Sequence, residues 1–284
     1  MENFKRIFTG FNISDKAREL TFDKEVNERR NDYIFKAISF IDLTTLEGND
    51  TFEKVGDLCD RAINPSNEKD VPTCAAICIY PRFVDFVMNK LAGTNIKTAS
   101  VATAFPSGQV PIELKIQEVK YCIEQGADEI DMVISRGEFL SNNYKLVSDE
   151  ISKISDLCKA GRDGKTIHLK VILETGELKT AENIYLASVL AINAGADFIK
   201  TSTGKISPAA TPEAAFVMLK VISDHYNKTG KRIGFKPAGG IRTSDEALQY
   251  ISMVKNILGD DWLKPELFRI GASSLLNNLI GDLK

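Results

Sequence analysis

Short apolar runs alternate along the chain with longer stretches in which apolar and polar residues recur at helical spacing. The short runs are rich in β-branched residues and predict eight strands, at residues 38–42, 75–80, 98–103, 129–134, 168–173, 198–201, 233–236 and 267–270. Each interval between them is long enough for one helix and its turns. Eight strand–helix units in roughly 250 residues are typical of a (β/α)₈ TIM barrel, which is an α/β fold.

Two helix starts support this alternation of strands and helices. Thr211 precedes Pro212, which places a capping residue before a proline in the first turn, and Thr243 stands three residues before Glu246, the spacing of a capping box. An open, doubly wound sheet is the alternative architecture. The Gly-x-Gly-x-x-Gly pattern that would follow its first strand is absent, so the barrel is favoured.

The segment before the first strand has a different character. Residues 13–37 are charged and carry scattered apolar positions at Leu20, Phe22 and Val26, which indicates one helix. We therefore expect an N-terminal helical lead-in, residues 1–37, packed on a barrel of residues 38–284. A chain of 284 residues with 43% hydrophobic and 26% charged residues is long enough for one large core.

Composition and charge exclude several classes of protein. The net charge is −3 and no basic cluster is interleaved with aromatic residues, so no nucleic-acid partner is expected. The N-terminus lacks the apolar core of a signal peptide, and no run of about 18 apolar residues occurs, so we expect a cytoplasmic protein without membrane contact. Five cysteines without CxxC spacing, and two distant histidines, His168 and His225, predict reduced thiols and no metal site.

Two lysines lie in apolar, strand-like contexts: Lys200 follows Phe198 and Ile199, and Lys236 follows Phe235. A lone lysine in a strand usually faces solvent, because lysine is almost never fully buried. A lysine that points into a packed interior is different, since burial favours the neutral amine, which is a nucleophile. Two such residues suggest carbonyl chemistry through a Schiff base.

A repeated phrase supports this interpretation. The letters GADEID, which end at Asp131, match GADFIK, which ends at Lys200, almost residue for residue. In both phrases a glycine suited to a helix C-terminus precedes a short strand. Asp131 and Lys200 would therefore hold equivalent positions, from which they could face each other across a closed barrel.

Glycines and hydroxyl residues follow the last three predicted strands. Any one of these loops could be an ordinary turn. Together they occupy the part of a barrel where phosphate commonly binds to backbone amides and helix N-termini. The candidate phosphate-binding residues are Gly204, Lys205, Gly239, Gly240, Gly271, Ser273 and Ser274.

Six stretches now become recognisable: FIDLTTL at 40–46, AICIYP at 76–81, ETGEL at 174–178, FIKTSTGK at 198–205, GFKPAGG at 234–240 and FRIGASS at 268–274. They resemble the 2-deoxyribose-5-phosphate aldolase family over about residues 38 to 276, and LKPELF at 263–268 is similar to its longer, animal-type branch. The resemblance implies a class I aldolase on a (β/α)₈ barrel, without metal or cofactor. Its reaction is the reversible cleavage of 2-deoxy-D-ribose 5-phosphate to acetaldehyde and D-glyceraldehyde 3-phosphate, in deoxyribonucleotide catabolism.

The same resemblance implies roles for three catalytic residues. The Schiff-base lysine falls on Lys200, the second active-site lysine on Lys236, and the proton-relay aspartate on Asp131. Lys170 and Asp42 complete a polar network, either as a buried pair that orients its neighbours or in direct proton transfer. Cys78 is expected to line the pocket as a small apolar residue.

The chain departs from the family in two ways, and other functions stay open. Its lead-in is longer than in short bacterial members, and it ends ten residues after Ser274 without a tail bearing a terminal Tyr, so no tail residue is assigned to enamine protonation. One alternative is a metal-dependent phosphosugar epimerase or isomerase. Another is a catalytically silent phosphate-binding barrel. A homo-oligomer is neither predicted nor excluded, because the helix faces show no further apolar stripe.

Overall fold

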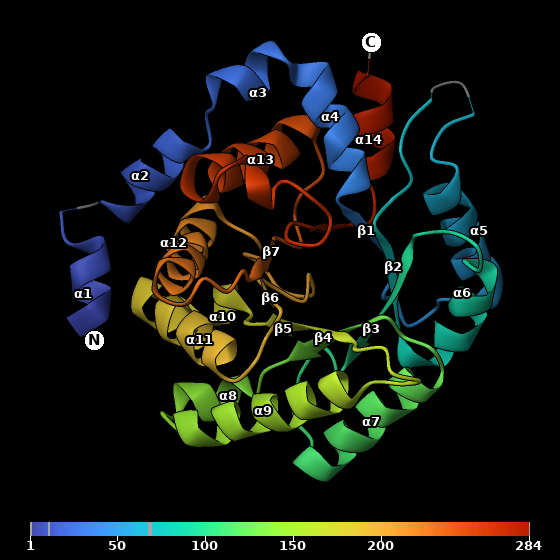
Figure 1. Cartoon of the computed structure of the whole chain (residues 1–284), viewed down its shortest axis with the longest axis horizontal. Coiled ribbons are helices and arrows are strands. Elements are labelled where there is room, and N and C mark those ends of the chain that lie inside the picture. The colour runs from blue at the N-terminus through green and yellow to red at the C-terminus, as the bar shows by residue number, and fades with distance from the viewer. Residues whose placement is uncertain (1, 11, 68–69, 284) are drawn as a thin grey trace.

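The computed structural model describes residues 2–10, 12–67 and 70–283. Its centre is a ring of parallel strands in the order β7-β6-β5-β4-β3-β2-β1-β8, with helices outside (Figure 1). The strands are β1 Ile41–Thr44, β2 Ala76–Ile79, β3 Lys97–Ala102, β4 Glu129–Val133, β5 His168–Ile172, β6 Phe198–Lys200, β7 Gly234–Lys236 and β8 Ile270–Ala272. The predicted (β/α)₈ barrel is confirmed.

The ring closes between β7 and β8 through single bridges instead of a continuous ladder. Phe235 pairs with Phe268 and Ala238 with Gly271, and the Gly271 amide donates to the Pro237 carbonyl at 2.9 Å. Parallel pairing of β8 with β1 completes the other side of this seam. All eight strands therefore point their carboxyl ends toward one mouth.

Two of the predicted strands were wrong at their ends. The first was placed at 38–42, but residues 38 and 39 form the last turn of a helix and β1 begins at Ile41. The last was placed at 267–270, but the amides of Leu267 and Phe268 both donate to the Lys264 carbonyl in a turn, so β8 begins at Ile270. Apolar periodicity alone does not separate such a buried turn from a strand.

Two of the helices outside the strands begin where their capping residues predicted. The Thr211 hydroxyl accepts the Ala214 amide, and Thr243 and Glu246 form the expected capping box. The helices are α5 Phe52–Ile63, α6 Val84–Lys90, α7 Ile112–Glu124, α8 Arg136–Leu140, α9 Tyr144–Ala160, α10 Thr175–Leu178, α11 Ala181–Asn193, α12 Pro212–Thr229, α13 Ser244–Leu258 and α14 Leu275–Asp282, with 3₁₀ turns η1 Pro81–Phe83 and η2 Asp260–Trp262.

The N-terminal segment is not the single helix predicted for residues 13–37. It forms α2 Ile13–Leu20, α3 Lys24–Glu28 and α4 Arg30–Ser39, after a first helix, α1 Glu2–Phe8, that the sequence pattern did not indicate. Asp23 ends the continuity, because its carboxylate caps α3 by accepting the Val26 amide at 3.0 Å. A division of the chain at residue 37 stays a prediction, since α4 runs through Ser39.

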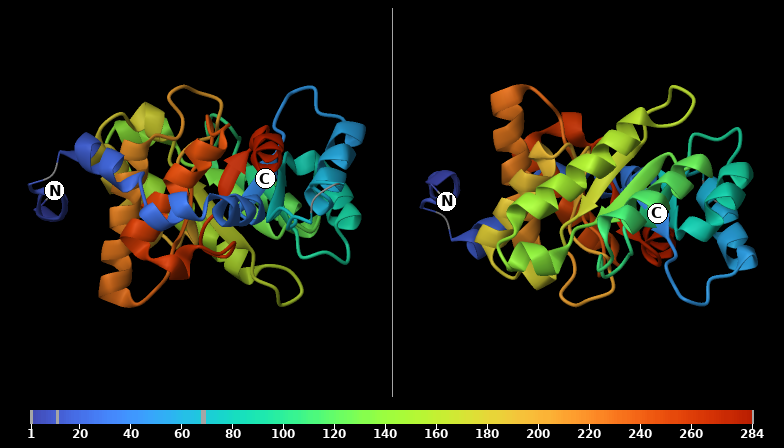
Figure 2. Two further views of the ribbon diagram at one scale, coloured as in Figure 1. Left: turned by 90° about the horizontal axis from the view of Figure 1, so that it is seen from above. Right: turned by 90° about the horizontal axis from the view of Figure 1, so that it is seen from below.

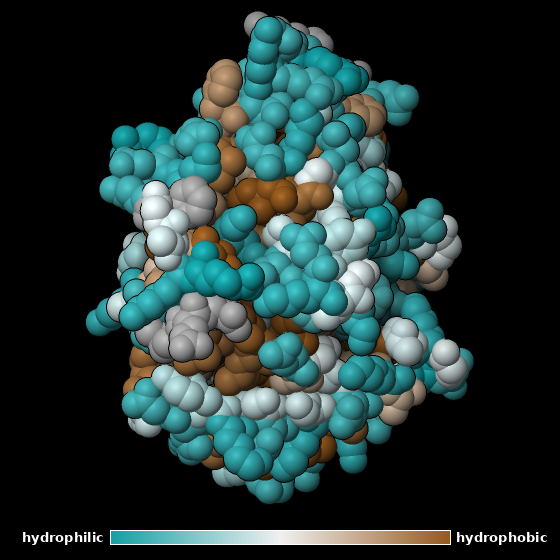
Figure 3. All heavy atoms as spheres, turned by 60° about the vertical axis from the view of Figure 1, so that its left-hand side comes forward, coloured by the Kyte–Doolittle hydropathy of each residue, from teal (hydrophilic) through white to brown (hydrophobic). Residues whose placement is uncertain are grey.

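These N-terminal helices lie over the barrel helices that flank the seam. α2 packs against α12 and α13, and α4 packs against α13 and α14 (Figures 1 and 2). On this side of the molecule hydrophilic side chains cover most of the surface, and hydrophobic ones show in recesses between them (Figure 3). No helix in the described residues is long and apolar enough to cross a membrane.

The repeated phrase is one structural device used twice. Gly126 and Gly195 end α7 and α11 with φ of +105° and +103°, and the residue after each donates to a carbonyl five residues back. Asp128 then accepts the Thr98 amide at 2.9 Å, and Asp197 accepts the Leu169 amide at 2.8 Å. Each aspartate thus ties its strand to the preceding one and fixes the side that the following residues face.

The barrel interior is divided by chemistry. β2 and β3 contribute small apolar side chains, including Ala76, Cys78 and Ala99. Toward the closed end Phe198 fills the space beside Gly234, where a Cβ would lie 2.3 Å from its ring. Strands β1, β4, β5, β6 and β7 contribute charged side chains, whereas the main hydrophobic core lies between the strands and the helices.

Candidate active site

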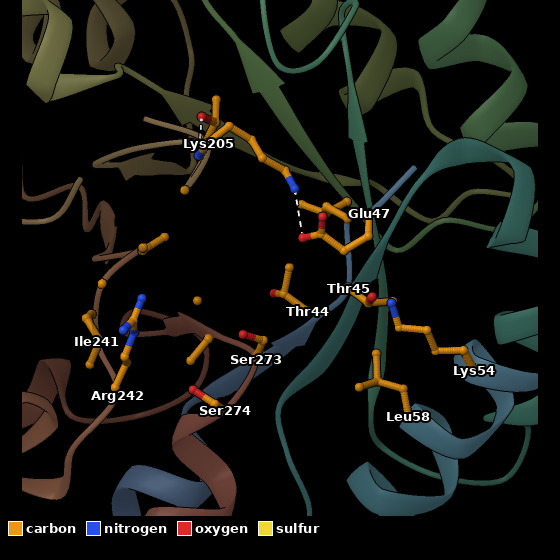
Figure 4. A pocket seen from close by; sticks show the side chains of 18 of the residues that line it. Thr44, Thr45, Glu47, Lys54, Leu58, Lys205, Ile241, Arg242, Ser273 and Ser274 are labelled. Carbon is orange, nitrogen blue, oxygen red and sulfur yellow. Dashed lines mark hydrogen bonds and ion pairs between the residues drawn. The ribbon is translucent and has the colours of Figure 1, made fainter. Parts of the chain in front are cut away.

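A cavity of about 760 Å³ opens at the carboxyl ends of the strands (Figure 4). The loops after β1, β6, β7 and β8 and one face of α5 form its wall. All seven candidate phosphate-binding residues line it: Gly204, Lys205, Gly239, Gly240, Gly271, Ser273 and Ser274. Lys200 lines it too, so the candidate nucleophile and the candidate anion-binding loops share one cavity.

Lys200 ends β6 and is 3% exposed. Its ammonium lies 2.7 Å from Oδ2 of Asp131, across the interior from β4. The predicted meeting of these two equivalent positions is confirmed. A primary amine that reaches the cavity beside a carboxylate can attack a carbonyl and pass protons to that carboxylate.

Lys236 is fully buried beneath the cavity. Its Nζ lies 2.7 Å from the same Oδ2 of Asp131 and 2.5 Å from Oδ2 of Asp42. The Nζ atoms of Lys200 and Lys236 are therefore separated by at most twice 2.7 Å. Two ammonium groups at that separation repel each other, and the carboxylate between them attracts both.

The supporting residues join the same network. Lys170 on β5 lies 3.0 Å from Oδ1 of Asp131 and 3.6 Å from Oδ2 of Asp42. It also donates to Glu129, two residues before Asp131 on β4. Arg269, just before β8, donates to Asp42 Oδ1 at 2.6 Å and to Glu129 Oε1 at 2.7 Å.

Glu129 and Arg269 were missed in the sequence. A signal existed for each, because Glu129 alternates with Asp131 and must share its face of β4, while Arg269 stands alone between Phe268 and Ile270. A charged residue at an inward position of a strand indicates a buried ion pair. Which residue completes the pair cannot be read from the pattern, since the partners lie on distant strands.

The network fixes which side chains carry charge. Burial alone would raise the pKa of Asp131, but Lys170, Lys200 and Lys236 outweigh burial and hold it well below its ordinary value. Burial would lower the pKa of Lys236, but Asp131 and Asp42 raise it above its ordinary value. Asp131 is therefore a carboxylate and Lys236 a permanent cation at neutral pH.

Cys78 lies inside the barrel, against the network. It is fully buried, and its Sγ lies 3.8 Å from Oδ2 of Asp131. Burial raises the pKa of its thiol, and the charge of Asp131 adds to this rise, so the thiol stays protonated. In the described part of the chain, no three His, Cys, Asp or Glu side chains gather where they could hold a metal ion.

A further buried carboxylate, that of Glu174, stabilises the loop after β6. Glu174 follows β5 in a left-handed conformation, with φ of +60°, and accepts both the amide of Thr203 at 3.1 Å and its hydroxyl at 2.6 Å. Arg136, the first residue of α8, pairs with Glu174 at 2.8 Å. Because the Thr203 hydroxyl in turn accepts the Lys205 amide, Glu174 sets the course of the loop that carries Gly204 and Lys205.

Two glycines in the loop after β7, Gly239 and Gly240, have a left-handed φ of +83°. A Cβ on Gly239 would lie 2.7 Å from Cβ of Ala209 and 2.9 Å from Cα of Gly204, so only glycine lets these loops approach. Gly240 also has φ of +83°, but nothing lies within 4 Å of its Cβ position. Gly240 therefore borders open cavity.

Lys205 pairs with a residue that the sequence did not indicate. Its ammonium lies 2.9 Å from Oε1 of Glu47, which comes from the loop after β1 on the opposite wall (Figure 4). Glu47 is 61% exposed, so the pair is weak and exchanges readily with another anion. The loops after β6, β7 and β8 thus offer hydroxyls, an ammonium and glycine-flanked amides to an anion, in the cavity that Lys200 also lines.

Comparison with known proteins agrees with this geometry. The model of the DeoC/LacD family aldolases matches residues 36–280. The deoxyribose-phosphate aldolases of Mus musculus and Homo sapiens are each 47% identical to the chain, over 87% of its length and 79% of theirs. Among solved structures, the tetrameric deoxyribose phosphate aldolase from Aeropyrum pernix is 27% identical over 88% of this chain and 93% of its own, with a TM-score of 0.69.

Proposed function

The chain belongs to the DeoC/LacD family of aldolases, and on that premise we propose that it cleaves 2-deoxy-D-ribose 5-phosphate reversibly to acetaldehyde and D-glyceraldehyde 3-phosphate. It is a class I aldehyde-lyase that works through a Schiff base. The observation that carries the proposal is the placement of Lys200, whose amine reaches the cavity while its partner carboxylate lies buried behind it.

The first step joins Lys200 to the C1 aldehyde of the substrate. The amine must be neutral to attack, and the fixed charge of Lys236 disfavours a second ammonium beside it. Attack forms a carbinolamine, and loss of water leaves an iminium. Asp131 is suited to carry the protons of this step, because its Oδ2 is within 2.7 Å of the reacting nitrogen.

The iminium then accepts the electrons of the C2–C3 bond. Removal of the proton from the C3 hydroxyl lets C3 become the aldehyde of glyceraldehyde 3-phosphate, while C2 remains in an enamine on Lys200. Protonation of the enamine at C2 and hydrolysis of the iminium release acetaldehyde. Asp131 is the proposed relay for these protons, and Lys170 and Asp42 hold it in place from behind.

The phosphate is held at the other end of the cavity. Amides of Gly204, Gly239 and Gly240 border it, and α14 begins after Ser273 and Ser274, which adds hydroxyls and a helix N-terminus. Lys205 exchanges Glu47 for the phosphate dianion. A phosphosugar is the proposed partner, and the cytoplasmic location stays a prediction. Self-association, which the sequence left open, is proposed from the tetramer of the Aeropyrum pernix relative.

Incubation with acetaldehyde and borohydride tests the proposal directly. Reduction should inactivate the protein and leave an ethyl group on Lys200, because an iminium is reduced to a stable secondary amine. Peptide mapping locates the group, and borohydride without acetaldehyde is the control. An adduct found only on Lys236 would contradict the assignment, and no adduct at all would favour a silent phosphate-binding barrel.

Gly240→Asp is expected to weaken substrate binding through the phosphate. The new carboxylate would stand in open cavity where a dianion must approach, so KM for 2-deoxyribose 5-phosphate should rise roughly tenfold to a hundredfold. Gly240→Asn is the matched control, with the same shape and no charge. Cleavage of unphosphorylated 2-deoxyribose should change little in either variant, and equal losses with both substrates would place the phosphate elsewhere.

A further inference from the structure

Ion pairs connect seven side chains inside the barrel, which we call the interior ion set: Asp42, Glu129, Asp131, Lys170, Lys200, Lys236 and Arg269. Each of these side chains is at most 4% exposed. Three are acids and four are bases, so the set carries a charge of +1 when every group is ionised. Its charge is zero when one base is neutral, and an uncompensated charge in a packed interior is costly.

Lys200 makes the fewest ion pairs of the four bases in this set. Lys236 pairs with two carboxylates, Lys170 contacts three, and Arg269 pairs with two. Lys200 pairs with Asp131 alone and is the member that lines the cavity. We therefore take Lys200, the proposed nucleophile, as the base whose proton decides whether the interior ion set is neutral.

Glu129 and Arg269 contribute one negative and one positive charge to the set, from a layer below the cavity. Glu129 lies two residues before Asp131 on β4, and Arg269 lies two residues before Gly271, which pairs with Asp42. Neither borders the cavity, and the Arg269 guanidinium lies 5.9 Å from the ring of Phe198 on the barrel floor. Both therefore act without touching the substrate.

We propose that Glu129 and Arg269 are positioning residues that set the proton occupancy of Lys200 by fixing the charge of the interior ion set. Glu129 acts through Lys170 and Asp131, and Arg269 acts through Asp42 and Lys236. The other titratable groups inside the barrel are Asp42 on β1, the neutral thiol of Cys78 on β2, Asp131 on β4, Lys170 on β5 and Lys236 on β7, whereas β3 contributes apolar Ala99 and Val101. Removal of the charge of Glu129 and removal of the charge of Arg269 should thus change the proton occupancy of Lys200 in opposite directions.

The test is the pH profile of kcat/KM, which rests on the proposed function. Glu129→Gln removes one negative charge, so Lys200 should lose its proton more readily and the acidic limb should move to lower pH. Arg269→Met removes one positive charge, so the limb should move to higher pH. Each shift should be about one pH unit, for a unit charge roughly 10 Å away at an effective dielectric constant of about 20.

Two variants separate charge from structure. The double variant Glu129→Gln/Arg269→Met restores the balance and should return the limb to its wild-type position. Arg269→Lys keeps the charge with fewer hydrogen bonds and should leave the limb unmoved, even if the protein is less stable. The position of the limb does not depend on how much activity remains, and circular dichroism identifies which variants fold.

A folded Glu129→Gln variant with a wild-type limb would overturn the proposal, as would shifts of the same sign in both single variants. A second measurement keeps this outcome distinct from a failure of the proposed function. Cyanate carbamylates only the neutral amine, so its rate of reaction at Lys200, followed against pH by peptide mapping, reports proton occupancy without any aldolase activity. The opposite shifts should appear in that rate as well.

Discussion

Replacement of Lys200 by methionine is expected to abolish cleavage of 2-deoxyribose 5-phosphate, with kcat/KM falling by roughly 10⁴-fold or more. No iminium can form without this amine, and Lys236 cannot substitute for it, because Lys236 is fully buried and bound to Asp131 and Asp42. The fold should persist, since the remaining interior ion set has three acids and three bases. Release of acetaldehyde in a coupled assay measures the loss.

Lys200→Arg is the matched control for that result. Arginine keeps a positive partner for Asp131 but forms no Schiff base, so it should be as inactive as methionine. Thermal unfolding of both variants shows whether the loss is chemical or structural. Substantial turnover by a folded Lys200→Met protein would refute the Schiff-base mechanism itself.

Lys236→Leu is expected to lower kcat/KM by roughly 10²-fold to 10⁴-fold and to move the acidic limb of the pH profile toward alkaline pH. Without this cation the interior ion set is neutral only while Lys200 keeps its proton, which favours the protonated form of Lys200. The limb is the informative part of the measurement. An activity loss with an unmoved limb would assign Lys236 to holding Asp131 or the substrate instead.

The same variant should be less stable by roughly 3–5 kcal/mol, because two buried carboxylates lose their common partner. The pKa of Lys236 is raised in the fold, since Asp131 and Asp42 outweigh burial. Its contribution is therefore fully present below the ordinary lysine pKa of about 10.4 and is lost only as pH rises beyond it. Urea unfolding at pH 6 and pH 8 should show the same deficit, and Lys236→Arg should recover part of it.

The central residues could be predicted because their signals are local. The phrase shared by Asp131 and Lys200 includes its own helix stop and its own aspartate clamp, so strand direction and facing side are encoded within six residues. Loops after parallel strands converge for a similar reason, which brought the glycines and serines into one cavity.

What the sequence did not predict depends on distant partners. Arg269 meets Glu129 and Asp42 only because the barrel closes, and Glu47 meets Lys205 across its mouth. Glu174 is part of the ETGEL stretch, but its hydrogen bonds to Thr203 depend on a left-handed backbone that is unfavourable for glutamate. Asn12 and Asp23 cap α2 and α3, and these caps mark where helices of the lead-in begin. The prediction of one helix at residues 13–37 used only charged and apolar positions and did not consider caps.

The pairing of Arg269 with Asp42 also has a consequence for the order in which the chain folds. These residues are 227 positions apart, and most of the barrel must be synthesised before the second one exists. Contacts of such long sequence separation form late, because the entropy of closing the intervening loop must be lost first. During synthesis Asp42 and Glu129 therefore lack their partner Arg269 until the end of the barrel is made, and the interior ion set is completed only when the ring closes.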